Sequence, residues 1–149
     1  MINLKTFIFI FIITLPLSST SLQKGKNSII DTTNNLVWQD TKDNITLIFT
    51  HEQSAQYCNK LRLNNYSNWR LPTVQEYKTV LDLNREDEIK LNKKFYFVVK
   101  DDYWTNDRTW LRNFGKYGYY IMIKSGHAYY QNRTYKKYVR CVKDLSTSN

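Results

Sequence analysis

Histidine and glycine are scarce in this chain of 149 residues. Its four glycines leave no room for a collagen-like repeat, which needs glycine at every third position. The two histidines, His51 and His127, lie in no recognisable catalytic motif, whereas an enzyme needs a base beside a nucleophile or two convergent carboxylates. Neither histidine is near a cysteine in sequence, which disfavours a metal site. We therefore predict a protein that is not an enzyme and holds no metal or cofactor.

Acidic residues are missing from the C-terminal quarter. Between Arg108 and Lys143 there is no Asp or Glu, although this stretch contains nine basic residues and nine aromatic rings. The preceding stretch, residues 22–107, holds twelve basic and twelve acidic residues and is neutral. The excess positive charge is therefore concentrated in one Tyr-rich segment, which predicts a surface for an anionic partner.

Two predicted loops in this segment carry the best candidates for ligand binding. Guanidinium and ammonium groups bind sulfates and phosphates, and Tyr or Trp rings can stack on sugar rings. The candidate ligand-binding residues are Arg108, Arg112, Lys116, Arg133, Tyr135, Lys136 and Lys137. The alternative interpretation is that these cations only solubilise the β-rich half while the tyrosines pack a sheet.

Residues 1–21 have the composition of a secretory signal peptide. Lys5 provides the positive start, an apolar run follows at 7–17, and small residues occupy 18–21. The run is too short for a stable bilayer anchor, so we predict cleavage after Ser21. An uncleaved membrane anchor is the alternative. No later segment is apolar enough to cross a membrane, so we expect a protein that is secreted, periplasmic or on the cell surface.

The remaining residues, 22–149, are enough for one domain, with a core that we place at 28–143. Cys58 and Cys141 are the two cysteines. In an oxidising compartment such a pair predicts a disulfide. In the chain-entropy model, closing this loop would stabilise the folded state by at most about 4.5 kcal/mol. Two free thiols and a metal pair are the alternatives.

The first half of the domain predicts a hairpin and two helices. Short apolar runs at 29–31 and 36–38 flank a Thr- and Asn-rich bend, as in a β-hairpin. Thr50 and Gln53 form a capping box for a helix over about 51–62, which would turn Cys58 inward.

The second helix follows Pro72, with Thr73 and Glu76 as its capping box. Its expected buried stripe consists of Val74, Tyr77, Val80 and Leu81. The charged segment 82–94 lacks a period and predicts a surface loop.

The second half predicts antiparallel strands. They are expected at 102–105, 119–123, 127–130 and 138–142, with a tight turn at Ser125–Gly126. Two helices early and strands late indicate an α+β domain, with both helices packed on an antiparallel sheet.

Several sequence runs occur in an order that resembles the Lcl C-terminal domain family, named for the C-terminal part of a bacterial collagen-like adhesin. The runs are Leu36–Asp40, Tyr57–Cys58, Asn68–Thr73 with Glu76, Tyr103–Thr105 and Tyr138–Val142. The resemblance covers residues 28–143. It implies an extracellular bacterial domain with a C-type-lectin-like fold, trimerisation, and binding of sulfated, glycosaminoglycan-like polymers.

The motif residues also have a structural interpretation. Trp38 and Trp69 are large apolar groups that a domain of this size would bury. Arg70 lies between Trp69 and Leu71 and is expected to pair with a carboxylate such as Glu76. We therefore interpret these residues as structural rather than as ligand contacts.

The end of one predicted strand offers a candidate calcium site, because lectin-like folds often bind this ion. Asn106 and Asp107, with Asp101 and Asp102 nearby, offer oxygen ligands. The Glu-Pro-Asn or Gln-Pro-Asp run of sugar-binding lectins is absent, so we interpret these residues as a strand end.

The sequence thus predicts a secreted, disulfide-bonded α+β domain that binds anionic polysaccharide or another cell-surface polyanion and has no nucleic acid as a partner. The resemblance implies that this domain forms a homotrimer. The alternative is a structural or protein-interaction module of the cell envelope. An enzyme would require a pocket lined by His51 or His127 with a carboxylate partner.

Overall fold

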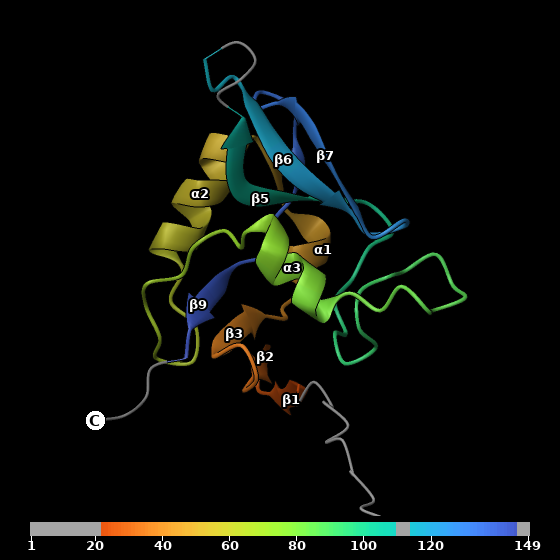
Figure 1. The fold of residues 1–149 in the computed structure, drawn as a ribbon. Coiled ribbons are helices and arrows are strands. Elements are labelled where there is room, and N and C mark those ends of the chain that lie inside the picture. Colours follow the sequence, from red (N-terminus) through yellow and green to blue (C-terminus); the bar gives the residue numbers. More distant parts are fainter. Residues whose placement is uncertain (1–21, 110–113, 146–149) are drawn as a thin grey trace, which may run out of the picture.

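A computed structural model describes residues 22–109 and 114–145 of the chain (Figure 1). The predicted signal peptide and the candidate residue Arg112 lie outside the described residues. The strands are β1 (Leu22–Gly25), β2 (Ser28–Asp31), β3 (Leu36–Gln39), β4 (Ile48–Phe49), β5 (Asp102–Thr109), β6 (Tyr117–Met122), β7 (His127–Asn132), β8 (Lys137–Tyr138) and β9 (Val142–Asp144). The helices are α1 (Asp43–Thr46), α2 (His51–Lys60) and α3 (Val74–Val80).

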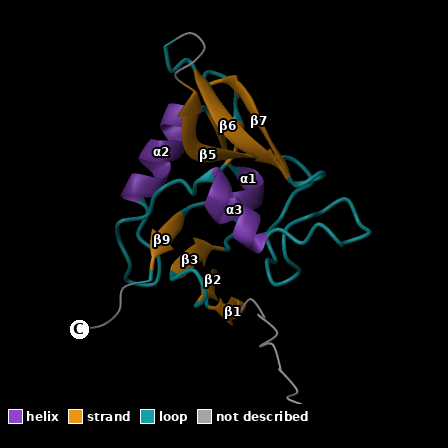
Figure 2. Ribbon diagram, viewed as in Figure 1, coloured by secondary structure: helices purple, strands orange, loops and turns teal. Residues whose placement is uncertain are grey.

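These strands form two sheets. One has the order β1-β2-β3-β9 and is antiparallel, and the other has the order β4-β8-β5-β6-β7. The second sheet is mixed, because β5 and β8 pair in parallel at Tyr103 and Tyr138. Figures 1 and 2 show β1–β3 at one end of the molecule and β6–β7 at the other. The α+β prediction is confirmed, while the likeness to C-type lectins stays a prediction.

Both predicted helices begin at the predicted capping boxes. Thr50 Oγ1 accepts from the Gln53 backbone N–H at 3.3 Å, and Gln53 Oε1 accepts from the Thr50 backbone N–H at 3.0 Å. Thr73 and Glu76 repeat the arrangement at α3, with distances of 3.1 and 2.7 Å. Arg70 donates to both carboxylate oxygens of Glu76, as expected, and also to Asp144.

The short helix α1 was not predicted, because four residues carry no helical period. Its Asn44 is buried, and the Asn44 side chain accepts from the Thr41 backbone N–H at 2.8 Å and donates to the Val139 carbonyl at 3.0 Å. No helix within the described residues has the length and apolar character needed to cross a membrane.

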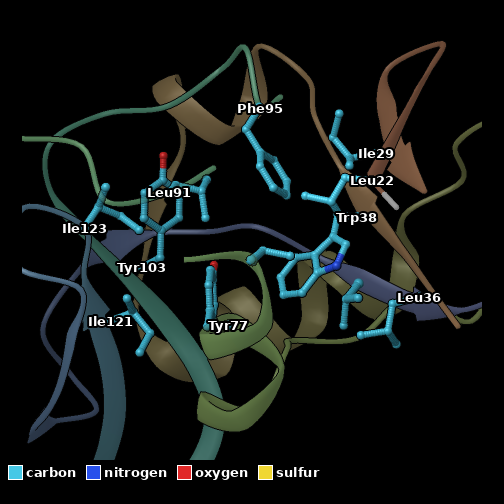
Figure 3. Close-up of a cluster of buried hydrophobic side chains, with 12 residues drawn as sticks. Leu22, Ile29, Leu36, Trp38, Tyr77, Leu91, Phe95, Tyr103, Ile121 and Ile123 are labelled. Carbon is cyan, nitrogen blue, oxygen red and sulfur yellow. The ribbon is translucent and has the colours of Figure 1, made fainter. Parts of the chain in front are cut away.

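The β5–β6 part of the second sheet is packed on both faces. Tyr103 and Ile121 lie opposite each other and share a buried cluster with Tyr77 of α3 (Figure 3). Trp104, the next residue of β5, lies in a second cluster with Cys58 of α2. Alternate residues of a strand face opposite sides of a sheet, so α3 covers one face and α2 the other. Trp38 and Trp69 are buried, as predicted.

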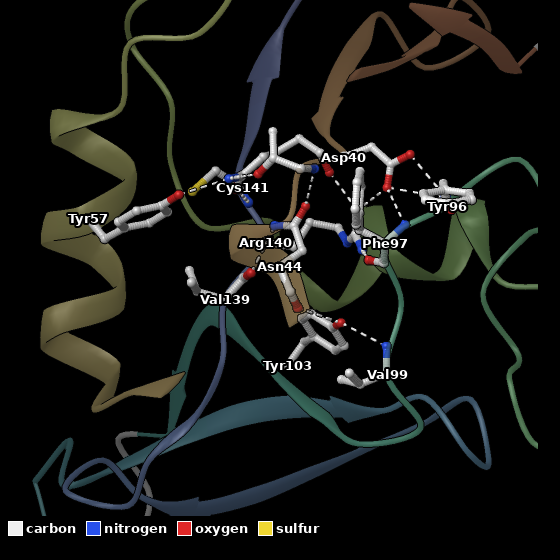
Figure 4. A network of polar contacts seen from close by, with 12 residues as sticks. Asp40, Asn44, Tyr57, Tyr96, Phe97, Val99, Tyr103, Val139, Arg140 and Cys141 are labelled. Atoms are coloured by element: carbon white, nitrogen blue, oxygen red, sulfur yellow. Dashed lines mark hydrogen bonds and ion pairs between the residues drawn. The ribbon is translucent and has the colours of Figure 1, made fainter. Parts of the chain in front are cut away.

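The last predicted strand is wrong as a single element. β8 ends at Tyr138 and β9 begins at Val142, and the two belong to different sheets. The connecting residue Arg140 is fully buried and donates to the carbonyls of Gln39 and Phe97 (Figure 4). Every residue from Val139 to Lys143 is buried, so no alternation of exposed and buried positions marks the crossing between sheets.

The predicted disulfide is confirmed. Cys58 of α2 is bonded to Cys141, and the two are 83 positions apart in sequence. Both cysteines are completely buried in the second cluster. The bond therefore ties α2 to the segment that crosses between the two sheets.

Candidate anion-binding site

Arg133 lies at the centre of the strongest candidate site. It follows β7, and its side chain donates from Nε to His51 Nδ1 at 3.2 Å and from Nη1 to the Gly115 carbonyl at 3.3 Å. Its backbone N–H donates to the Lys116 carbonyl at 2.9 Å, and its carbonyl accepts from the His51 N–H at 3.0 Å. Four hydrogen bonds thus fix both the backbone and the guanidinium of this one residue.

His51 is the first residue of α2 and is completely buried. Its Nε2 lies 2.9 Å from the Thr105 carbonyl. Burial, followed by the positive charges of Arg133 and Arg108, lowers the pKa of His51 to about 4, so the ring is neutral near pH 7. The Nε2–H tautomer satisfies both contacts, because Nε2 then donates to Thr105 while Nδ1 accepts from Arg133.

Gly118 of β6 makes room for this pair. A Cβ at this position would lie 2.7 Å from His51 Cδ2 and 3.3 Å from Arg133 Cγ. Any side chain larger than hydrogen would therefore push His51 away from the sheet. The glycine is needed for this close approach and not for a turn.

A surface cavity of about 500 Å³ opens beside Arg133, and we call it the Arg133 notch. It is lined by Thr50, Glu52, Lys116, Asn132, Arg133 and Thr134. Two of these groups are cationic, one is acidic, and the others offer hydroxyl and amide groups. Partial burial and the nearby charge of Arg108 lower the pKa of Arg133, although Glu52 opposes the shift. Placing an anion in the notch would relieve this repulsion.

The structure brings together three of the predicted binding residues. Arg133 and Lys116 line the notch, and Arg108 is close enough for its charge to affect Arg133. Tyr135 and Lys136 are exposed immediately beyond it, with Tyr135 57% exposed. The candidate anion-binding site therefore consists of five predicted residues in and around the notch, namely Arg108, Lys116, Arg133, Tyr135 and Lys136.

Lys137 does not belong to this surface, which corrects the predicted set. Its side chain is 7% exposed, and Nζ lies 2.8 Å from Asp102 Oδ2 and 3.7 Å from the centre of the Tyr120 ring. The reason is that β8 pairs with β4 and directs this residue into an aromatic cluster. Arg140 and Lys143 are also buried, so the basic segment contributes less surface charge than its composition indicates.

The sequence did not reveal the role of His51 or of Glu52. The capping box placed both residues at a helix start, but the contact of His51 with Arg133 spans 82 positions and leaves no local pattern. The sequence signal was the position of His51 directly after the N-cap residue Thr50, because the backbone N–H groups in the first turn of a helix have no partner within the helix.

The acidic residues considered for calcium are used in other ways. Asp107 Oδ2 accepts from the Val74 backbone N–H at 2.6 Å, and Asp102 pairs with Lys137. Asn106 is exposed, and its backbone N–H donates to the Pro72 carbonyl at 2.8 Å. Within residues 22–109 and 114–145, no three His, Cys, Asp or Glu side chains gather in a way that could hold a metal ion.

Comparison with known proteins identifies the family. No curated protein gives a significant match to the chain. The sequence profile of the Lcl C-terminal domain matches residues 27–143, which is most of the chain and includes every element from β2 to the start of β9. The chain therefore belongs to the Lcl C-terminal domain family.

Proposed function

We propose that this domain binds an anionic polysaccharide and that Arg133 is the central contact to its sulfate or carboxylate groups. The observation that carries the proposal is the kind of partner that holds Arg133. Arg70, Arg85 and Arg140 are each paired with a carboxylate. Within the described residues, the side-chain hydrogen bonds of Arg133 go instead to neutral acceptors, so its orientation is fixed without an ion pair.

The surroundings of Arg133 favour a charged polymer over a small anion. Arg108, Lys116 and Lys136 are exposed cations around the same cavity or beside it in sequence. Several cations along one surface can contact successive anionic groups of a chain, and each contact releases counterions. Affinity should therefore fall steeply with salt concentration.

Family membership and the disulfide support the biological setting of the proposal. The family is associated with bacterial adhesins, so we place the domain in attachment to a surface, as a non-catalytic module. A buried disulfide is stable in an oxidising environment, which fits a secreted, periplasmic or surface-exposed protein. In a homotrimer, three notches on one assembly would raise the avidity for a repetitive polymer.

The test is calorimetric titration of the oxidised domain, residues 22–149, with a heparin-derived hexasaccharide over a series of salt concentrations. Arg133→Gln is compared with Arg62→Gln, which removes the same charge from an exposed side chain whose hydrogen bonds to described residues go to the nearby carbonyls of Asn59 and Leu61. We expect a loss of about tenfold for Arg133→Gln, as for one charge-assisted contact, and little change for Arg62→Gln. Equal losses in both variants would show that only net charge matters, and the proposal would fail.

A conservative variant separates binding from folding. Arg133→Lys keeps the charge but cannot bond His51 Nδ1 and Gly115 in the same geometry, so we expect it to retain the salt dependence and lose part of the affinity. Thermal unfolding of each variant verifies that the fold is intact.

The edge of β7 supports a second candidate, a protein-interaction module. This strand has the sequence HAYYQN, with no Asp, Glu, Lys, Arg or Pro, and it forms one edge of its sheet. Such an edge can pair with a strand of another protein. Association by this route would be insensitive to salt, so the same titrations distinguish it from polysaccharide binding.

A further inference from the structure

A second cavity lies across the sheet from His51, and its chemistry differs from that of the Arg133 notch. It has a volume of about 280 Å³, and we call it the Tyr119 pocket. It is lined by Val74, Gln75, Asp107, Arg108, Tyr119 and Ala128. Tyr119 and Ile121 are two positions apart in β6, so their side chains face the same side of the sheet, and Ile121 is buried with Tyr77 of α3. The pocket therefore lies on the α3 face of the sheet, whereas Gly118 faces His51.

The walls of the Tyr119 pocket combine an aromatic ring with three different polar groups. The Tyr119 ring lies 6.0 Å from the Tyr130 ring at an angle of 72°, which limits its movement. Asp107 Oδ2 accepts from the Val74 backbone N–H at 2.6 Å, which holds this carboxylate at the wall of the pocket. Gln75 offers an amide and Arg108 a guanidinium, and both are exposed.

This combination suits a sugar ring. The C–H face of a pyranose is apolar and can pack on a tyrosine ring, while its hydroxyls need both donors and acceptors. Carboxylate, amide and guanidinium groups supply both kinds. A polymer of phosphate groups has no such face and would gain nothing from the aromatic wall.

Arg108 connects the Tyr119 pocket with the Arg133 notch. It lines the pocket, and it lies opposite Gly118, the residue whose added Cβ would contact His51 and Arg133. Its charge also lowers the pKa of Arg133. Among the described residues, β8 pairs with β5 only at Tyr103, and the end of β5 that carries Arg108 pairs with β6. Arg108 is thus the residue that relates the two cavities.

We propose that one polysaccharide chain occupies both cavities, with an anionic substituent in the Arg133 notch and a neighbouring sugar ring against Tyr119. The inference rests on the proposed function and narrows it. The ligand class becomes an anionic polysaccharide whose rings present an uncharged face, and a polyanion without sugar rings binds at the notch alone.

The experiment compares two probes, the heparin-derived hexasaccharide and inorganic polyphosphate, by calorimetry at several salt concentrations. Ala128→Leu fills the Tyr119 pocket from β7, and Gln75→Ala removes an exposed amide from it. His127→Leu is the matched control, because it places a leucine at the neighbouring position, whose side chain faces the opposite side of the sheet.

For the hexasaccharide, we expect Ala128→Leu to raise the Kd about 3- to 10-fold, the loss of one aromatic contact, with an unchanged dependence on salt. Gln75→Ala should raise the Kd in the same direction. The Kd of polyphosphate should not change in either variant, and His127→Leu should behave as the wild type with both probes.

Two results would overturn the inference while leaving the proposed function in place. One is a hexasaccharide Kd that is the same in Ala128→Leu and His127→Leu. The other is an equal loss of affinity for polyphosphate and hexasaccharide. If the wild-type domain does not bind the hexasaccharide in a salt-dependent manner, the proposed function itself fails, and this inference fails with it.

Discussion

Substitution of Gly118 by Ala tests whether the contact between His51 and Arg133 depends on the missing side chain. The added Cβ would lie 2.7 Å from His51 Cδ2, well inside van der Waals contact. His51 cannot move freely, because its ring is buried and lies 2.9 Å from the Thr105 carbonyl. Overpacking of this kind costs about 1–3 kcal/mol, and the lower entropy of the unfolded chain offsets about 0.4–1 kcal/mol of it. We therefore expect a net loss of about 1–2 kcal/mol.

The assay is urea unfolding of the oxidised domain, with Gly25→Ala as the matched control. A Cβ at Gly25 would lie 2.8 Å from Ser28 Oγ, which donates to the Lys26 carbonyl and accepts from Asn64 Nδ2, both at 3.3 Å. Moving this hydroxyl weakens two long hydrogen bonds but displaces no buried ring, so the control should lose less than about 1 kcal/mol. Affinity for the heparin hexasaccharide should also fall in Gly118→Ala, since a displaced His51 no longer holds Arg133. Equal stability in the two variants would refute the steric argument.

Two further predictions concern buried ionisable groups. Lys137→Met leaves the largely buried carboxylate of Asp102 without its ion-pair partner and should lower the free energy of unfolding by about 2–4 kcal/mol. Lys136 is exposed, so Lys136→Met should lower the affinity for the hexasaccharide without loss of stability. Folding lowers the pKa of His51 from 6.5 to about 4, so the unfolded chain binds a proton first as the pH falls. Stability should therefore decrease between pH 6.5 and 4, by up to about 3 kcal/mol, and urea titrations of His51→Gln should lack this part of the decrease. An unchanged pH profile in His51→Gln would contradict the assignment.

Features with a local cause could be predicted from the sequence. The capping boxes at Thr50 and Thr73 depend on residues three positions apart, and the hairpin at 29–38 depends on one turn. The pairing of Cys58 with Cys141 followed from the number of cysteines and the expected compartment. The groups in the capping boxes and the hairpin are close in sequence, and each cysteine has one other cysteine in the chain with which to pair.

The features that could not be predicted depend on distant contacts. Lys137 and Lys136 are adjacent and identical in type, yet only Lys137 meets Asp102 and an aromatic cluster. Arg140 looks like a surface residue in a basic segment, but it is buried against the chain around Gln39 and Phe97. A count of charges cannot separate such buried cations from those that remain at the surface, such as Arg108.

The crossing of the C-terminal segment between the two sheets has a consequence for the order of folding. β8 joins β4 to β5, and β9 completes the sheet begun by β1–β3, so neither sheet is finished until residues 137–144 have been synthesised. The contacts that this segment makes, such as Gln39 with Cys141, span about a hundred positions and close late and slowly. The completion of both sheets therefore depends on this one segment. Truncation before Lys137 should leave β4 without its partner strand and Cys58 as an unpaired thiol.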